Sequence, residues 1–175
     1  MELFDAIRQR HSYRGEFTDA AVPRSDLEKI VQAAIDAPSG CNAQTTSFVI
    51  VDDADCLRQI AEIVDKPYCR AAKAMIACVT DPRPAYGNCS FAAEDCAAAV
   101  ENMLLAITAL GYATVWLDGV LRAEDRAARI GRLLGVPSDK NVRVLLPIGV
   151  PSQHTQPREK QPFSQRAWFN RFGGA

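Results

Sequence analysis

Hydrophobic residues recur along much of the chain at the spacing of an amphipathic helix. The best-marked case has apolar side chains at positions i, i+3, i+4 and i+7, namely Leu27, Ile30, Val31 and Ala34. Ser25 and Glu28 have the spacing of a capping box, in which each side chain bonds the other residue's backbone amide. We therefore predict a helix that begins near Ser25 and ends before Pro38, because the residue before a proline avoids the helical conformation.

The longest predicted helix runs from about Phe91 to Leu110. Its apolar residues step by four and three positions along one seam, namely Cys96, Val100, Met103, Ile107 and Leu110. Gly111 follows as the expected stop. Similar spacing predicts shorter helices near residues 3–7, 57–64 and 123–134, with a short one near 163–170.

Four short apolar runs have the length and composition of buried strands: residues 45–51, 74–80, 113–117 and 142–150. Helices and strands alternate, which indicates a layered α/β or α+β domain. The alternation also suits a doubly wound parallel sheet, and it does not fix the strand order. Segment 151–175 contains Pro151, Pro157 and Pro162, so we predict an extended C-terminal arm there.

Composition narrows the class of protein. The chain has 175 residues, 48% hydrophobic and 23% charged, and we interpret residues 1–175 as one domain. A formal net charge of −1 gives no basic excess, so we expect neither nucleic acid nor a membrane as a partner. The start of the sequence lacks the apolar core of a signal peptide. The six cysteines include no C-x-x-C pair, and we expect reduced thiols and a cytoplasmic location.

Two short segments carry candidate chemistry. In the first, Arg10 and Arg14 lie four residues apart with Ser12 between them, a set that suits a phosphate or another polyanion. A solvated basic helix end is the other interpretation. The second segment, residues 37–44, is a tight loop whose amides and hydroxyls could line a planar polar heterocycle, or it is an ordinary connection.

Other kinds of site lack support in the sequence. There is no G-x-G-x-x-G motif and no P-loop, so we predict no Rossmann site for NAD(P)H. No Ser–His–Asp set is evident. The two histidines, His11 and His154, have no metal-ligand spacing with the cysteines. We therefore predict no metal site and no catalytic side chain.

Taken in order, the motifs of the chain resemble those of the FMN-dependent nitroreductase family. They begin with R-H-S-x-R at 10–14 and A-P-S-G-x-N-x-Q at 37–44. The long helix contains E-N-x-L-L-A, and A-L-G, V-W-L-x-G, L-G-V-P and L-x-P-I-G-x-P follow before a basic pair that precedes Pro162. Each motif is weak alone, but together they cover nearly the whole chain and resemble a short member of the family.

The resemblance implies a binding site for the FMN phosphate. Arg10 and Ser12 match contacts to the phosphate and the ribityl chain. Arg158 and Lys160 match a basic pair that reaches the phosphate from the C-terminal arm. His11 lies in the same motif and is either a cofactor contact or a structural histidine.

The resemblance also implies contacts to the flavin rings. Arg14 matches a cation near the pyrimidine edge, where a fixed positive charge favours the reduced flavin. Gly119, directly after Asp118, matches a residue whose backbone N–H points at N5, the hydride-accepting atom. A loop that the partner subunit commonly donates packs along the flavin, and its matching residues are Pro38, Ser39, Gly40 and Asn42.

The implied fold is α+β, with a mostly antiparallel central sheet flanked by helices, a C-terminal arm and an intertwined homodimer. The implied activity is an FMN-dependent oxidoreductase. Tightly but non-covalently bound FMN would take a hydride from NADH or NADPH and pass two electrons to a nitroaromatic, a quinone or an activated alkene. Reductive dehalogenation or flavin fragmentation is one alternative, for which residues 81–91 are the obvious lid candidate. A non-catalytic flavin-binding redox sensor or store is another.

The sequence departs from the family pattern near the flavin loop. Thr45 and Thr46 stand where relatives usually have a proline and a large aromatic residue. Asp118 stands where relatives have Glu or Gly, which leaves its own role open. Cys41, inside the loop, is either a small filler or a redox-active thiol. Cys96 belongs to the apolar seam, so we assign it to packing.

Overall fold

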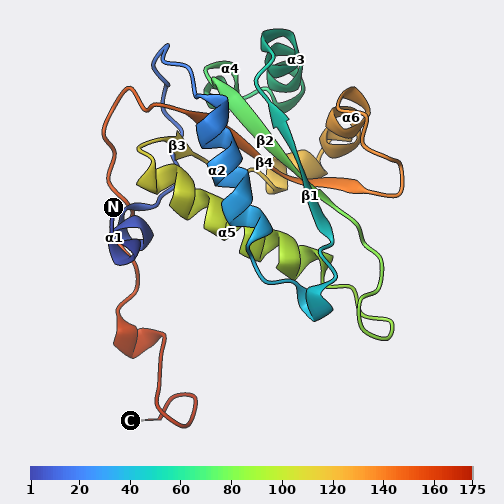
Figure 1. Cartoon of the computed structure of the whole chain (residues 1–175). Helices are drawn as coiled ribbons and strands as arrows, with labels where there is room; N and C mark the ends of the chain where they lie inside the picture. Colours follow the sequence, from blue (N-terminus) through green and yellow to red (C-terminus); the bar gives the residue numbers. More distant parts are fainter. Residues whose placement is uncertain (175) are drawn as a thin grey trace.

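A four-stranded sheet in the order β1-β2-β4-β3 forms the centre of the computed structural model, which describes residues 1–174 (Figure 1). The strands are β1 (Thr46–Val51), β2 (Ala74–Thr80), β3 (Ala113–Thr114) and β4 (Asn141–Gly149). Every neighbouring pair is antiparallel. The α+β prediction is therefore confirmed, and the doubly wound parallel sheet is excluded.

Strands β1 and β2 come from similar apolar runs but differ in burial. All residues of β2 are buried, because β1 and β4 pair with its two edges and helices cover its two faces. Strand β1 is at the edge of the sheet, and its residues Ser47 and Ile50 are exposed. The prediction of a buried strand at 45–51 is wrong on this point, because an apolar run alone does not distinguish a central strand from an edge strand.

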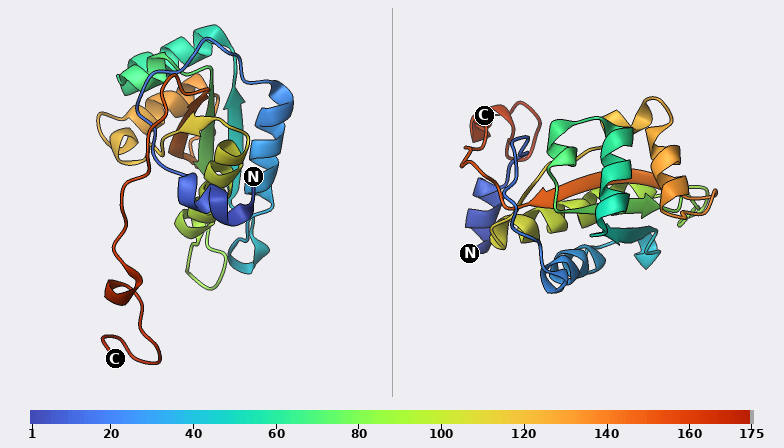
Figure 2. Two further views of the ribbon diagram at one scale, coloured as in Figure 1. Left: turned by 90° about the vertical axis from the view of Figure 1, so that its left-hand side faces the viewer. Right: turned by 90° about the horizontal axis from the view of Figure 1, so that it is seen from above.

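Helices cover both faces of the sheet (Figure 2). Alternate residues of β2 point to opposite faces. Ile76 and Cys78 join a core cluster with one layer of helices, while Met75 and Ala77 join the other cluster. The first layer holds α2 (Arg24–Ile35) and α5 (Ala92–Ala109), and the second holds α3 (Ala54–Val64), α4 (Pro67–Arg70) and α6 (Arg126–Leu133).

The long helix follows its predicted seam except at Leu110, which lies just past the end of α5 and is 37% exposed. The buried residues of α5 include Cys96, Val100, Met103 and Ile107, so the packing role assigned to Cys96 is confirmed. The capping box predicted for α2 is wrong. That helix begins at Arg24, Pro23 occupies the N-cap position, and no side chain caps it.

Two predicted elements are shorter in the structure. The strand expected at 113–117 consists of β3 and an isolated bridge between Leu117 and Leu145. The helix expected at 123–134 is confined to α6, which a short 3-10 helix (Gly119–Arg122) precedes. Within residues 1–174, none of the helices has the length and apolar character needed to cross a bilayer.

The segment that follows α1 (Leu3–Gln9) lies beside the start of the C-terminal arm. Helix α1 packs near α5, and Phe17 forms a bridge with Pro151. The arm then leaves the body of the molecule past α1 and ends in a projecting tail (Figures 1 and 2). Only Phe163–Gln165 of the predicted helix at 163–170 forms a helical turn. Ala175, the last residue of the predicted domain and arm, lies outside the described residues.

Candidate functional site

An open cavity lies where the two ends of the folded chain meet. Its volume is about 660 Å³, and we call it the basic cavity. Its lining comes from two segments far apart in the sequence: Arg10, His11, Ser12, Arg14 and Gly15 from the first, and Thr155, Gln156, Pro157, Arg158 and Lys160 from the second. All the cofactor contacts predicted near the chain ends therefore face one space.

Backbone carbonyls bring the two segments together. Tyr13 is only 2% exposed, and its N–H donates to the Thr114 carbonyl at 2.8 Å. Its hydroxyl donates to the Glu16 carbonyl at 2.6 Å. The N–H and hydroxyl of Ser152 donate to the same Glu16 carbonyl at 3.0 and 2.8 Å. These bonds hold the start of the arm beside the segment that follows α1.

His11 joins the two sides of the basic cavity. Its Nδ1 lies 2.7 Å from the Gln9 carbonyl oxygen, and its Nε2 lies 2.7 Å from Thr155 Oγ1. Because a carbonyl only accepts, Nδ1 carries a proton, and in the neutral ring Nε2 accepts from the Thr155 hydroxyl. Both ring nitrogens are engaged, which favours the structural interpretation of His11.

Cationic side chains give the cavity an excess of positive charge. Arg10 Nε lies 3.5 Å from Glu101 Oε1 of α5, and the Arg10 side chain is 24% exposed, so its guanidinium is held in place. Arg14 lies near Tyr68. Burial raises the pKa of the Tyr68 hydroxyl, and the Arg14 cation opposes that rise. With Arg158 and Lys160 on the arm, the cavity suits an anionic group with several oxygen acceptors.

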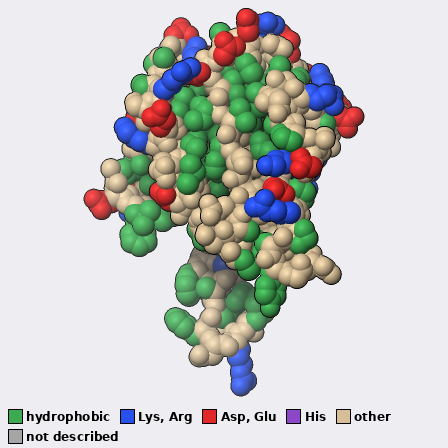
Figure 3. Space-filling model, turned by 45° about the vertical axis from the view of Figure 1, so that its right-hand side comes forward, with side chains coloured by type: hydrophobic (Ala, Val, Ile, Leu, Met, Phe, Trp, Pro, Cys, Tyr) green, Lys and Arg blue, Asp and Glu red, His purple; other side chains and the backbone are tan. Residues whose placement is uncertain are grey.

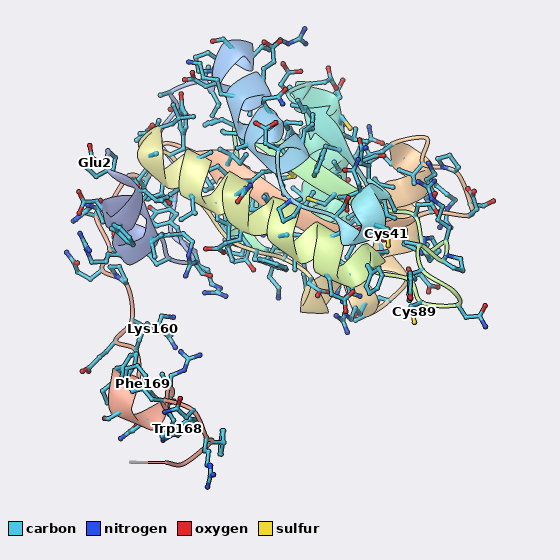
Figure 4. The ribbon with its side chains drawn as sticks, turned by 60° about the horizontal axis from the view of Figure 1, so that its bottom comes forward. Glu2, Cys41, Cys89, Lys160, Trp168 and Phe169 are labelled. Carbon is cyan, nitrogen blue, oxygen red and sulfur yellow. The ribbon has the colours of Figure 1, made fainter. Side chains whose placement is uncertain are left out.

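The second group of predicted residues belongs to the 38–44 loop, which lies near the N-terminal end of α5. Figure 4 shows Cys41 of this loop toward one end of α5, while Glu2, next to α1, lies toward the other end. Gly40 is required here, because a Cβ atom would lie 2.3 Å from the Phe91 ring. Three non-glycine residues of the loop have positive φ: Cys41 (51°), Asn42 (53°) and Gln44 (51°).

A smaller cavity of about 150 Å³ borders this loop. Its lining includes Pro38, Ser39 and Gln44 of the loop, together with Asp95 and Ala99 of α5. It shares no lining residue with the basic cavity. The structure therefore places the predicted phosphate contacts and the predicted flavin-loop contacts in two separate parts of one chain.

Asp118 and Gly119 occupy a third place. The Asp118 carboxylate accepts two hydrogen bonds from Arg122, at 2.7 and 2.9 Å, and lies 3.4 Å from Arg143. Arg122 lowers the pKa of Asp118, and Arg143 adds to this effect. These arginines occupy the carboxylate, which favours a structural role for Asp118. Gly119 is exposed at the start of a 3-10 helix, and its contact with a cofactor stays a prediction.

Sequence reasoning missed three residues that organise these places. Thr155 holds His11, Glu101 holds Arg10, and Asp95 bonds the 38–44 loop. For Asp95 a signal was present, because it lies four residues before Ala99 on the buried side of the long helix. Glu101 opens the E-N-x-L-L-A motif, which did not indicate its contact with Arg10, and Thr155 belongs to none of the motifs. Within residues 1–174, no group of three or more His, Cys, Asp and Glu residues is placed to hold a metal ion.

Comparison with known proteins relates this arrangement to one family. The profile described as "Nitroreductase family" matches residues 7–74 and 69–150. A protein of Archaeoglobus fulgidus named "Putative NADH dehydrogenase/NAD(P)H nitroreductase" is 34% identical over 86% of each chain. A crystal structure with the same protein name, from Parabacteroides distasonis, has a TM-score of 0.83 at 26% identity and covers 96% of this chain and 97% of its own.

A second solved structure shares the fold. It is titled as an FMN-dependent nitroreductase from Clostridium difficile, with a TM-score of 0.83 at 22% identity, and covers 97% of this chain and 99% of its own. The family profile and the relative from Archaeoglobus fulgidus confirm the resemblance predicted from the sequence motifs.

Proposed function

Because this chain belongs to the nitroreductase family, we propose that it is an FMN-dependent NAD(P)H oxidoreductase that reduces a small organic acceptor. The acceptor would be a nitroaromatic, a quinone or an activated alkene. Residues 1–175 would form one FMN-binding domain. The bound flavin would supply the hydride-accepting atom, and this chain's residues would bind and orient it.

The observation that carries the proposal is the basic cavity. A phosphate monoester has a charge of about −1.5 to −2 near neutral pH and three strong acceptor oxygens. Arg10, Arg158 and Lys160 supply cationic donors in one space, and Ser12 supplies a hydroxyl there. Guanidinium groups are well suited to phosphate because they donate in a fixed fork. The residue set therefore fits the phosphate end of FMN.

Other residues of the first segment would meet the rest of the cofactor. Arg14 lines the same cavity, and a cation beside the pyrimidine edge would stabilise the negative charge of the reduced flavin. Gly119 would offer its backbone N–H. No side chain is assigned as an obligatory acid or base, so this chain would act by binding the flavin tightly and setting its potential.

A complete flavin site would need a second copy of this chain. None of the residues 38–44 lines the basic cavity of the same chain. The partner's loop would therefore cover a flavin held in this chain's cavity. The tail supports a dimer, because Phe163, Phe169 and Phe172 are 69%, 78% and 92% exposed. Figure 3 shows hydrophobic side chains on the projecting tail and on the face above it. Exposed apolar patches of this kind mark interaction surfaces.

The cell compartment is also part of the proposal. All six cysteines are free thiols, and Cys69, Cys78 and Cys96 are buried. Free thiols persist in a reducing cytoplasm. We place the enzyme there.

The test is a visible absorption spectrum of the purified protein before and after incubation with FMN and desalting. A retained two-peaked flavin spectrum is expected. Anaerobic addition of NADH or NADPH should then bleach it, and a nitroaromatic or a quinone should restore it. Folded protein that retains no flavin would contradict the proposal. Retained flavin that neither nucleotide reduces would favour a flavin sensor or store.

A further inference from the structure

One buried carboxylate bonds both ends of the 38–44 loop to the body of the molecule. Asp95, in the first turn of α5, is 5% exposed. Its Oδ1 accepts from the Gly40 N–H at 2.7 Å, and its Oδ2 accepts from the Thr45 hydroxyl at 2.6 Å. Gly40 and Thr45 lie on either side of the positive-φ residues, so the two bonds grip the loop at both ends of its strained part.

We propose that Asp95 is a positioning residue that holds the 38–44 loop in the shape that contacts the flavin. This inference rests on the proposed function. Asp95 would not touch the cofactor and would act only through Gly40 and Thr45.

The backbone of the loop cannot hold this shape unaided. Cys41, Asn42 and Gln44 all have positive φ, a region that is unfavourable for residues with a Cβ atom. Such residues keep this conformation only where surrounding contacts impose it. Backbone bonds within the loop, from the Asn42 N–H to the Ser39 carbonyl and from the Ala43 N–H to the Gly40 carbonyl, supply part of this constraint, and contacts from outside the loop supply the rest.

Packing supplies only part of those contacts: Phe91 packs closely against Gly40, but Ser39 and Gln44 border the 150 Å³ cavity. Polar contacts complement the packing. Arg83 Nη2 donates to the Ala43 carbonyl at 2.8 Å, and the Gln44 N–H donates to Ser39 Oγ at 3.1 Å. Arg83 is exposed, whereas Asp95 is buried, and a hydrogen bond shielded from water is the stronger constraint.

The position of Asp95 suits a buried negative charge. It lies in the first turn of α5, where the helix dipole stabilises an anion. None of the ion pairs within residues 1–174 includes Asp95, so the amide and hydroxyl donors of the loop compensate its charge. Loss of the carboxylate would leave both loop donors without their acceptor.

Thr45 gives Asp95 a second hydrogen bond to this loop, in addition to the bond from the Gly40 amide. It is 2% exposed and stands where the family resemblance leads us to expect proline. A proline at this position has no hydroxyl to donate, so Asp95 would hold only the Gly40 amide. The departure from the family pattern at Thr45 thereby acquires a physical role.

The first measurement is hydrogen exchange of residues 39–45 in the full-length protein, with and without FMN. Asp95→Ala should speed exchange in this segment by about tenfold or more, because a bond to a charged acceptor is lost. Thr45→Val should give a smaller increase. Asp95→Asn should restore slow exchange, since its amide oxygen can accept from Gly40 and its amide group can donate to Thr45.

Asn102→Ala is the matched control. Asn102 also lies on α5, and its Nδ2 donates to the Ala33 carbonyl of α2 at 2.9 Å. This variant removes a polar contact of the same helix without touching the loop. It should lower the melting temperature while exchange in residues 39–45 and the Kd for FMN stay unchanged.

The second measurement is the Kd for FMN, from quenching of flavin fluorescence. Asp95→Ala should raise it by about tenfold and Thr45→Val by about threefold, with Asp95→Asn close to the wild type. If the wild type binds FMN and both Asp95→Ala and Thr45→Val leave the Kd unchanged, the inference is overturned and the proposed function stands. If the wild type binds no FMN, the proposed function fails, and the exchange rates still decide whether Asp95 holds the loop. Should Asp95→Ala not fold, Thr45→Val gives both readouts.

Discussion

The basic cavity and the 38–44 loop are built in different ways. The cavity joins residues 10–15 and 155–160, and His11 bonds across it to Thr155. It needs only one chain. The loop presents Cys41 and Asn42 to solvent, while its Gly40 N–H donates a hydrogen bond to Asp95 of α5. One region is an open cavity, and the other is a loop that is anchored to α5 and exposes its outer residues.

Under the proposed function, this difference predicts how the flavin site would divide between two chains. If both regions bind one flavin, they must come from different copies, because a single chain keeps them toward different ends of α5 (Figure 4). The tail, which carries exposed aromatic residues beyond Lys160, would hold the copies together. The predictions below test this division, beginning with the tail.

Deletion of residues 162–175 should have the largest effect. The variant keeps Arg158 and Lys160, so each chain retains its basic cavity, but it loses Phe163, Trp168, Phe169 and Phe172. Burying one aromatic side chain contributes about 1.5–3 kcal/mol, so the dimer should be lost, and FMN retention with it. Light scattering and the flavin spectrum measure the two losses. A control that removes only residues 173–175 should remain a flavin-bound dimer, and a truncated monomer that keeps FMN would refute the two-chain site.

Mixing two chains that are each defective in FMN binding should restore part of the bound flavin. One chain carries Arg10→Ala and Arg158→Ala, and the other carries Gly40→Val, whose side chain would collide with Phe91. In a mixed dimer, one site combines the intact cavity with the intact loop. Random pairing should therefore recover about a quarter of the sites, as two-fold symmetry requires.

The readout is bound flavin after the two chains are unfolded and refolded together. Each defective chain refolded alone is the control and should retain little FMN. Absence of recovery in dimers shown to be mixed would mean that both regions of a site come from the same chain.

Most elements of the fold could be predicted from local patterns. The sequence alone predicted the buried face of α5, because its apolar residues keep helical spacing from Cys96 to Ile107. It did not predict the strand order, because pairing depends on contacts between distant segments. Only the family resemblance indicated the antiparallel sheet. The difference between β1 and β2 was hidden for the same reason, since neighbours along the sheet decide which strand is an edge.

The candidate site could be predicted only in part. Motif positions selected the residues at both ends of the chain, and the structure brings them together in one cavity. The motifs included Glu101 but could not reveal its contact with Arg10, nor that of Thr155 with His11, because these contacts join segments far apart in the sequence. They did not show that Asp118 is bound by Arg122, four residues further on, or by Arg143 of β4, which is distant in the sequence.

Arg10→Ala should weaken FMN binding without dissociating the proposed dimer. Loss of a hydrogen bond to a charged group costs about 1.5–3 kcal/mol, which corresponds to an increase of roughly ten- to one-hundred-fold in Kd. Arg8→Ala is the matched control, because Arg8 lies on α1, is paired with Asp5 and does not line the cavity. Flavin fluorescence titration measures both. Equal affinities for the two variants would remove Arg10 from the phosphate site.

The smallest expected effect concerns Asp118, which lies outside both regions. Hydrogen bonds from Arg122, reinforced by Arg143, hold its pKa below the ordinary value of 3.8. Because the folded pKa is the lower one, Asp118 stabilises the fold above the ordinary value, and this contribution is lost as the pH falls through the lowered pKa. Asp118→Asn should cost about 0.5–1 kcal/mol near pH 7, as for a partly exposed ion pair, and progressively less in acid.

Urea unfolding at several pH values measures this loss. Arg122→Gln should cost a similar amount, and the double variant little more than either, since both substitutions remove the same pair. FMN affinity should stay unchanged, because Arg122 and Arg143 already occupy the Asp118 carboxylate. A loss of affinity greater than about tenfold would instead place Asp118 with the flavin contacts, as a bond to a charged group would require.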